Sequence, residues 1–267
     1  MPNIPLAERL RPKTIDEYIG QEHLVGRNGV FRKFFETGNV PSFILWGPPG
    51  VGKTTLAKIV ATQLDRPFFT LSAVTSGVKE VREVIESARK QRFFDQRPPF
   101  LFIDEIHRFN KSQQDSLLGA VEQGIVTLIG ATTENPSFEV ISPLLSRCQV
   151  YILRPMEDKD LQTLLDRALT ADIELREREI EVQQTGALFR FAGGDARKLL
   201  NILDIIVGAT DGKVTITDQY VTDCLQQNIA LYDKNGEQHY DVISAFIKSV
   251  RGLSLIHISE PTRLALI

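Results

Sequence analysis

The sequence has few cysteines, no long apolar run and little excess of charge of either sign. Cys148 and Cys224 are the only cysteines among 267 residues, which excludes a framework of several disulfides and favours a reducing compartment. No stretch approaches the roughly 18 uninterrupted apolar residues of a membrane-spanning helix. The opening MPNIPLAERLRPKT contains no apolar segment of the kind found in secretion signals. We therefore expect a soluble, intracellular protein.

The overall composition is that of a globular protein. Hydrophobic residues make up 42% of the chain and charged residues 24%, enough for one large domain or two smaller ones with a core. The net charge of −3 excludes a histone-like polycation. It does not exclude DNA binding, because a local basic surface is sufficient for that.

Residues 43–64, FILWGPPGVGKTTLAKIVATQL, are the most informative segment. The apolar run 43–46 predicts a buried strand, and the later apolar residues recur at helical spacing. Between them, GPPGVGKT matches G-x-x-x-x-G-K-[ST] in the strand-to-helix setting that a phosphate-binding loop requires. A glycine-rich turn that binds nothing is the alternative, but it explains neither the lysine nor the following helix.

Each part of this loop has a chemical role in the prediction. The glycines let successive backbone N–H groups face the phosphates, and the positive end of the helix adds to the field. Lys53 is predicted to reach the β- and γ-phosphates, and the Thr54 hydroxyl to coordinate Mg²⁺. The predicted nucleotide contacts are Gly47, Pro48, Pro49, Gly50, Val51, Gly52, Lys53, Thr54 and Thr55.

A second apolar strand, residues 100–103, ends in two acids. In a parallel sheet, these carboxylates reach the same crevice as the phosphate loop. Asp104 is predicted to hold Mg²⁺, and Glu105 to orient and deprotonate the attacking water. Taken alone, the two acids could simply cap the next helix. Since a single histidine is weak evidence for a metal site, His107 is interpreted as a structural or supporting residue.

A third strand is predicted at residues 126–131, followed by Thr132, Thr133 and Asn135. Polar groups at this strand end could sense the γ-phosphate or the water, and we favour Thr133 for this role. A simple Asn-Pro turn explains Asn135 almost as well. With further strands at 68–72 and 149–153 alternating with helices, the pattern predicts a parallel α/β sheet.

Arg147 follows Ser142 and Pro143, which form a typical helix start with a hydroxyl cap and an early proline. No acidic residue lies near Arg147 in the sequence. A structural arginine bonding carbonyls at a helix end is one interpretation. The other is that Arg147 meets a negative charge supplied from elsewhere.

Strand signals fade after residue 155, and leucine-rich helical patterns indicate a small helical lid with a hinge near Pro155. In GGDARKLLN, Asp195 is the expected helix cap, which places Arg197 in the first helical turn. A cation there opposes the helix dipole, so we interpret Arg197 as reaching the γ-phosphate. A solvated surface arginine is the alternative.

Together these segments resemble the AAA+ ATPases, in the branch that contains clamp loaders and the RuvB motor. GPPGVGKTT is similar to the Walker A motif, LFIDEIH to Walker B, IGATTEN to sensor 1, LLSRC to the arginine-finger motif and GGDARKLLN to sensor 2. LAERLRPKTIDEYIGQEHLVG resembles the box preceding the P-loop, which implies that backbone around Tyr18 and Ile19 holds adenine. The resemblance implies that Arg147 acts on a neighbouring subunit's γ-phosphate.

IHRFNKSQQDSLLGAVEQG and GATTENPSFEV more specifically resemble the bacterial replication-associated recombination family, kin to Werner-helicase-interacting proteins. This resemblance implies ATP and Mg²⁺ as cofactors and DNA junctions, gaps or stalled forks as partners. It also implies homo-oligomers, contact with single-stranded-DNA-binding protein and a nucleoid-associated cytoplasmic location. Alternatives are a clamp-loader-like ATPase subunit, which would bind a sliding clamp, and a nucleotide-binding adaptor without turnover.

The expected division is an α/β nucleotide-binding domain at 1–155 and a helical lid at 156–228. A linker and the start of a truncated oligomerisation region follow at 229–252. Residues 253–267, LSLIHISEPTRLALI counted from Leu253, lack a period and are interpreted as a non-native tail, which puts oligomerisation and activity of this chain in doubt. Cations in residues 76–97 suit DNA contact and ordinary helix-surface pairing equally: Lys79, Arg82, Arg89, Lys90, Arg92 and Arg97.

Overall fold

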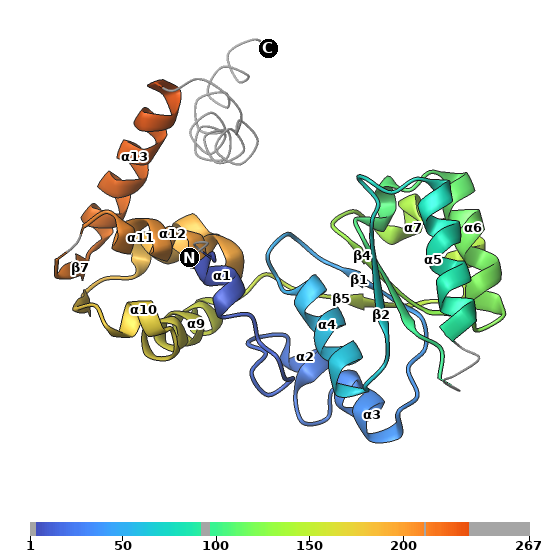
Figure 1. The fold of residues 1–267 in the computed structure, drawn as a ribbon. Coiled ribbons are helices and arrows are strands. Elements are labelled where there is room, and N and C mark those ends of the chain that lie inside the picture. The colour runs from blue at the N-terminus through green and yellow to red at the C-terminus, as the bar shows by residue number, and fades with distance from the viewer. Residues whose placement is uncertain (1–3, 92–96, 211, 235–267) are drawn as a thin grey trace, which may run out of the picture.

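The computed structural model describes residues 4–91, 97–210 and 212–234. Within them, a lobe built on a parallel sheet is followed by a smaller helical lobe (Figure 1). The predicted tail at 253–267 and most of the predicted region 229–252 lie outside the described residues. In the described parts, no helix is both long and apolar enough to cross a membrane.

Five parallel strands form the main sheet in the order β2-β3-β4-β1-β5. Their bounds are β1 Phe43–Trp46, β2 Phe68–Ser72, β3 Phe100–Asp104, β4 Thr127–Thr132 and β5 Gln149–Ile152. The predicted parallel α/β sheet is therefore confirmed, with β4 beginning one residue later than expected. Its carboxyl ends carry the acids of β3 and the threonines of β4 on neighbouring strands.

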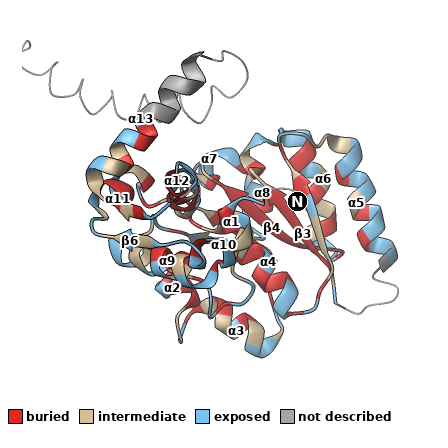
Figure 2. Ribbon diagram, turned by 60° about the vertical axis from the view of Figure 1, so that its left-hand side comes forward, coloured by how far each residue is buried: buried red, intermediate tan, exposed pale blue. Residues whose placement is uncertain are grey.

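Alternating strand residues feed two cores, one on each face of the sheet. Phe43, Phe100 and Ile129 face a cluster shared with α3 Val30–Thr37 and α4 Lys53–Gln63. Ile44 and Leu101 face a second cluster shared with α5 Val78–Gln91 and α6 Lys111–Glu122. The central strands β1, β3 and β4 are buried along most of their length because both faces are covered, whereas the edge strands β2 and β5 are more exposed (Figure 2).

Shorter elements complete the sheet lobe. They are α2 Glu22–Val25, the 3₁₀ turn η1 Ile106–Arg108, α7 Pro136–Glu139 and α8 Ser142–Leu145. The expected cap of α8 is wrong in detail. Ile141 is the N-cap and makes no side-chain cap bond, Ser142 is already the first helical residue, and Pro143 is the second.

The smaller lobe is helical, as predicted, and it also contains a two-stranded parallel ladder that the sequence did not suggest. Its helices are α9 Asp158–Ala171, α10 Ile173–Arg176, α11 Gly186–Ala192, α12 Ala196–Gly208 and α13 Asp218–Lys234. The ladder pairs β6 Ile180–Val182 with β7 Val214–Ile216. Helix α13 runs without a break across residue 228, where the lid was expected to end.

The N-terminal helix α1, Leu6–Arg9, packs in the lid core although it precedes the sheet in sequence. Leu6 is fully buried there. Helix α1 lies beside α12 (Figure 1). Arg9 Nε and Nη2 donate to the two carboxylate oxygens of Asp172 at 2.7 and 3.0 Å. Burial raises the pKa of Asp172, but the Arg9 bonds and the Leu175 N–H outweigh it and lower the pKa overall. The N-terminal arm therefore joins the two lobes.

Candidate nucleotide-binding site

The loop between β1 and α4 forms a cradle of backbone groups. Gly50 and Gly52 adopt left-handed φ angles of 69° and 94°, which bend the chain so that α4 begins at Lys53. A side chain on Gly52 would lie 2.4 Å from the Tyr18 hydroxyl oxygen. Only glycine fits this position, which is the observation expected of a loop built to approach phosphates closely.

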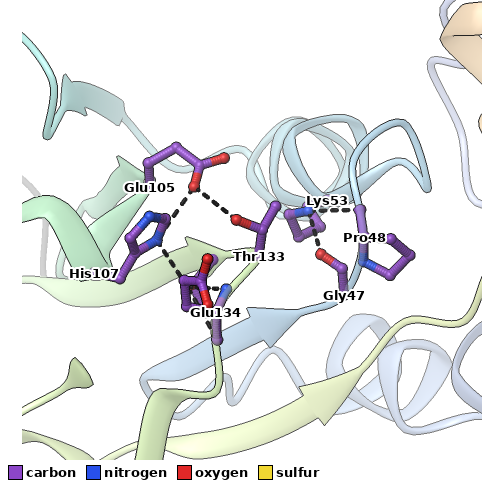
Figure 3. A network of polar contacts seen from close by, with 8 residues as sticks. Gly47, Pro48, Lys53, Glu105, His107, Thr133 and Glu134 are labelled. Atoms are coloured by element: carbon purple, nitrogen blue, oxygen red, sulfur yellow. Dashed lines mark hydrogen bonds and ion pairs between the residues drawn. The ribbon is translucent and has the colours of Figure 1, made fainter. Parts of the chain in front are cut away.

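Lys53 is buried at the base of this cradle. Its ammonium donates to the carbonyls of Gly47 at 2.7 Å and Pro48 at 2.8 Å (Figure 3). Burial lowers the pKa of Lys53, and the carboxylates of Glu105 and Asp104 oppose this shift. Lys53 lies in the wall of the cavity described next, where an anionic ligand would offset the desolvation of its ammonium.

A cavity of about 460 Å³ lies between this cradle, the N-terminal arm and the lid. That volume lies within the ordinary range of small-molecule sites, about 300–1,000 Å³. The predicted contacts that line it are Tyr18, Ile19, Pro49, Gly50, Val51, Gly52, Lys53, Thr54, Thr55, Asp104, Glu105 and Arg197. Gly47 and Pro48 lie beneath it as acceptors of the Lys53 bonds.

Tyr18 contributes its side chain as well as its backbone. Its hydroxyl donates to the Val51 carbonyl at 2.9 Å, and burial raises the pKa of the phenol. This bond fixes the N-terminal box against the phosphate loop. The predicted adenine-binding role of Tyr18 and Ile19 stays a prediction, supported by their place in the cavity wall.

The residues present fit a nucleotide with a divalent metal. Asp104 and Thr54 offer one carboxylate and one hydroxyl to the cavity, and oxygen ligands of this kind suit Mg²⁺. Over the described ranges, no group of three or more histidine, cysteine, aspartate or glutamate side chains could hold a metal by itself. This suits a metal that completes its coordination with phosphate oxygens and water.

Thr133 lies next to Glu105. Its hydroxyl donates to Glu105 Oε2 at 3.3 Å (Figure 3). Asn135 instead caps α7, accepting from the Ser137 N–H at 3.0 Å, which is the turn interpretation. The geometry therefore separates these two candidates and leaves Thr133 as the proposed sensor.

Arg197 is an exposed residue of the first turn of α12, whose N-cap Asp195 accepts from the Lys198 N–H at 2.9 Å. The lid is docked directly on the phosphate loop, because the Ala196 N–H donates to the Gly50 carbonyl at 3.2 Å. This contact brings Arg197 into the cavity wall. Arg197 is one of the cations that lower the pKa of Lys53.

Arg147 is the predicted cation that does not line the cavity. It lies just after α8, and its Nη1 donates to the Pro143 carbonyl at 2.7 Å. Its Nη2 contacts Glu122 Oε1 at 2.5 Å, so its acidic partner comes from the end of α6. These are the contacts of a structural arginine within one chain. An arginine that acts on a neighbouring subunit would equally lie outside its own cavity.

The sequence interpretation missed several cavity residues, among them Arg11, Arg167 and Asn201. Arg11 Nη1 donates to Thr55 Oγ1 at 3.2 Å, and its Nε donates to the Glu8 carboxylate at 3.0 Å. The RPKT segment of the N-terminal box was a usable signal for Arg11. No sequence signal pointed to Arg167 or Asn201, because helical periodicity does not show which polar residues line a cavity.

Replacing Gly50 by alanine is expected to weaken ATP binding. The left-handed backbone costs an L-residue about 1–2 kcal/mol, and 1.4 kcal/mol corresponds to tenfold in affinity. In addition, the new methyl carbon would lie 1.7 Å from Asp195 Oδ1 and push the lid away. We therefore expect a loss of at least about tenfold, measured by titration with a fluorescent ATP analogue.

Gly38→Ala is the matched control for this substitution. Gly38 has a φ of 68°, and a side chain there would meet nothing within 4 Å. It should lower stability by a comparable strain while leaving ATP affinity unchanged. Equal affinity of both variants and the unaltered chain would show that the lid is not packed on Gly50 in solution.

The sheet order, the phosphate loop and the strand-end acids define a P-loop domain of the AAA class, and the chain belongs to this family. Residues 43–156 match the ATPase family associated with various cellular activities (AAA), and residues 174–251 match the AAA C-terminal domain. Within the family, the chain is related to replication-associated recombination protein A. It is 44% identical to that protein of Coxiella burnetii, over 93% of this chain and 57% of the relative.

Other relatives agree with this placement. Replication-associated recombination protein A of Escherichia coli K12 is 43% identical, again over 93% of this chain and 57% of its own. ATPase WRNIP1 of Dictyostelium discoideum is 43% identical over 93% of this chain and 31% of its own. The chain thus spans little more than half the length of the bacterial relatives.

A solved structure supports the fold independently. The RuvB Holliday junction branch migration motor of Thermotoga maritima superposes with a TM-score of 0.65 at 28% sequence identity. The match covers 81% of this chain and 72% of that one. The predicted fold class, a P-loop AAA+ core followed by a helical lid, is thereby confirmed.

Proposed function

We propose that this chain binds and hydrolyses ATP and couples hydrolysis to work on DNA at single-strand/duplex junctions or gaps. The observation that carries the proposal is one cavity lined by Lys53, Asp104, Glu105 and Arg197, drawn from three separate motifs. The relatives named for replication-associated recombination support the biological setting, replication-fork maintenance, recombination and repair.

The residues divide the chemistry between them. Lys53 and the loop N–H groups would bind the β- and γ-phosphates, while Thr54 and Asp104 would hold Mg²⁺. Bound Mg²⁺ would neutralise charge developing on the phosphate oxygens. Glu105 would accept the proton of the attacking water, and Thr133 and Arg197 would report and stabilise the γ-phosphate.

Self-association would complete the site. Arg147 lies outside its own cavity, so the proposal assigns it to the nucleotide of a second copy. Its bond to Glu122 joins two half-exposed side chains, and pairs of this kind contribute only about 0–1 kcal/mol. Such a weak bond can be exchanged for a phosphate on a neighbouring subunit at small cost.

DNA is the proposed macromolecular partner, and single-stranded-DNA-binding protein a further one, in a nucleoid-associated location. The α5 cations give limited support to DNA contact. Lys79 pairs with Glu83 at 3.8 Å and Arg89 with Glu86 at 3.2 Å, as ordinary helix neighbours do. Arg92 lies outside the described residues. Phosphate contacts do not read sequence, so we propose recognition of DNA structure.

Specific ATPase activity measured against protein concentration tests this function. We expect it to rise with concentration and to rise further with gapped duplex DNA, compared with blunt duplex of the same length. Lys53→Ala supplies the background rate. Activity that is flat in both concentration and DNA, with ATP still bound, would favour an adaptor. Binding to a sliding clamp would favour the clamp-loader-like alternative.

A further inference from the structure

Glu105 is held in an unusual backbone conformation. Its φ is 54°, and only two other non-glycine residues in the described ranges, Gln21 and Asp65, have a positive φ. This conformation costs about 1–2 kcal/mol for an L-residue, and such strain concentrates at functional sites. Glu105 directly follows the strand β3 and is the N-cap residue of the turn η1, so the chain changes direction at this residue. The fold therefore fixes the direction in which this side chain leaves the backbone.

One oxygen of Glu105 is held by two polar side chains. His107 Nδ1 lies 3.2 Å from Glu105 Oε2, and Thr133 Oγ1 lies 3.3 Å from the same atom (Figure 3). Both contacts are on the side of η1 and β4. The Glu105 carboxylate nevertheless lines the nucleotide cavity, where Lys53 also lies. Oε1 is the oxygen that these two contacts do not engage.

The oxygens around Nδ1 assign the proton on the His107 ring. The Thr132 hydroxyl donates to the Glu134 carbonyl at 3.2 Å, and its oxygen accepts from the Glu134 N–H at 3.0 Å. His107 Nδ1 lies 3.0 Å from that oxygen. The ionised Glu105 carboxylate can only accept, so a ring nitrogen 3.2 Å from its Oε2 must carry hydrogen to bond with it. Nδ1 therefore carries hydrogen and is shared between Thr132 Oγ1 and Glu105 Oε2.

We propose that His107 positions Glu105 for the attack of water on ATP. The Nδ1–H group, held on Thr132, fixes Oε2 and leaves Oε1 oriented toward the cavity. A catalytic base that is oriented by a third group is the general arrangement of activated nucleophiles. This inference deepens the proposed ATPase function and rests on it. His107 itself touches neither nucleotide nor water in this scheme.

A purely structural histidine would not need this geometry. His107 is nearly buried, with a side chain 13% exposed, and Thr132 alone would satisfy Nδ1. The Nδ1–H group is instead shared between the buried Thr132 hydroxyl and the Glu105 carboxylate, which lines the cavity. The hydroxyl of Thr133, the proposed sensor, donates to the same carboxylate. Residues that follow β3 and β4 therefore contact one oxygen, Glu105 Oε2.

Three substitutions of His107 distinguish a role in positioning Glu105 from a role in packing alone. The amide nitrogen of asparagine lies where Nδ1 lies, whereas that of glutamine lies where Nε2 lies. We expect His107→Ala and His107→Gln to lower kcat by about 10- to 100-fold, the usual range for residues that orient a functional group. His107→Asn should retain most of kcat. Affinity for ATP should stay unchanged in all three.

Different results would contradict the positioning role of His107 and the proposed ATPase function. Equal kcat for the asparagine and glutamine variants, or a loss confined to KM, would overturn the positioning role. A chain without turnover even before substitution, with gapped DNA and at high concentration, would instead overturn the proposed ATPase function. Urea denaturation of each variant identifies any loss that comes from unfolding.

The ring proton gives a readout that is independent of turnover. ¹⁵N NMR of the unaltered chain, labelled at histidine, should show His107 as the Nδ1–H tautomer. A Glu105→Ala variant should shift the Nδ1 resonance, because it removes the carboxylate that accepts from this nitrogen. Detection of the Nε2–H tautomer in the unaltered chain would overturn the proposal directly.

Discussion

Replacing Arg147 by alanine is expected to lower ATP turnover by about 10³- to 10⁵-fold, the range seen when an arginine finger is lost from a GTPase. Arg147 lies outside its own cavity and pairs with Glu122 instead. In the proposed assembly, its guanidinium stabilises charge that develops on a neighbour's phosphoryl group. ATP affinity should change little, because charge stabilisation of this kind acts mainly in the transition state. Turnover and nucleotide titration, measured across a range of protein concentrations, test both statements.

Two controls isolate the finger from the surface pair. Glu122→Ala removes the partner of Arg147 within the chain, so a loss caused by breaking that pair would be reproduced there. Arg32→Ala is a matched change elsewhere, because Arg32 also bonds a carbonyl, that of Val25, and an acid, Asp16. Both controls should keep turnover near that of the unaltered chain.

Mixing experiments test whether Arg147 acts between subunits. The Arg147→Ala chain keeps Glu105, and the Glu105→Gln chain keeps Arg147. Mixed assemblies contain interfaces with both residues intact, so activity should reappear when the two inactive variants are combined. Arg147→Ala turnover equal to that of the unaltered chain at every concentration would contradict the assignment and leave the structural interpretation.

Replacing Glu105 by glutamine is expected to lower turnover by about 10²- to 10⁴-fold, the usual contribution of a general base. The amide keeps the shape of the side chain but cannot accept the proton of the attacking water. ATP should still bind, because Lys53 and the loop N–H groups are untouched. Stopped-flow single-turnover rates and equilibrium binding separate the two effects.

Glu134→Gln is the matched control for Glu105. Glu134 is an exposed carboxylate close to the same network, and its backbone N–H and carbonyl make its bonds to Thr132. Removing its charge should leave turnover near the starting value. If Glu105→Gln retained the rate of the unaltered chain, another group would have to accept the proton.

Much of the fold could be predicted from the sequence because local signals are strong in it. The apolar run 43–46 ends in a glycine loop and a lysine, and the strand 100–104 ends in acids. In a parallel sheet these ends meet at one edge, so the order of motifs along the chain placed Lys53, Asp104 and Glu105 together. Asp195 as a helix cap was equally readable, since capping is a local hydrogen bond.

Contacts between distant segments were decided by tertiary structure. Leu6 packs in the lid core, Glu122 pairs with Arg147, and Arg11 reaches Thr55 across 44 positions. No periodicity encodes such partners, because a pattern shows which face of an element is apolar and not what will cover it. The ladder of β6 and β7 was missed for the same reason, as strands of three residues are defined by pairing.

The sequence by itself determined the chemistry offered to a nucleotide: the glycine loop, the lysine, the paired acids and the arginine-bearing segments. The tertiary structure alone decided how these groups are oriented. His107 gave almost no signal in the sequence, yet it is within hydrogen-bond reach of Glu105 because β3 and β4 are neighbours and η1 turns back between them. Residue type fixes what a group can donate or accept, whereas the packing of distant strands fixes the atom it meets.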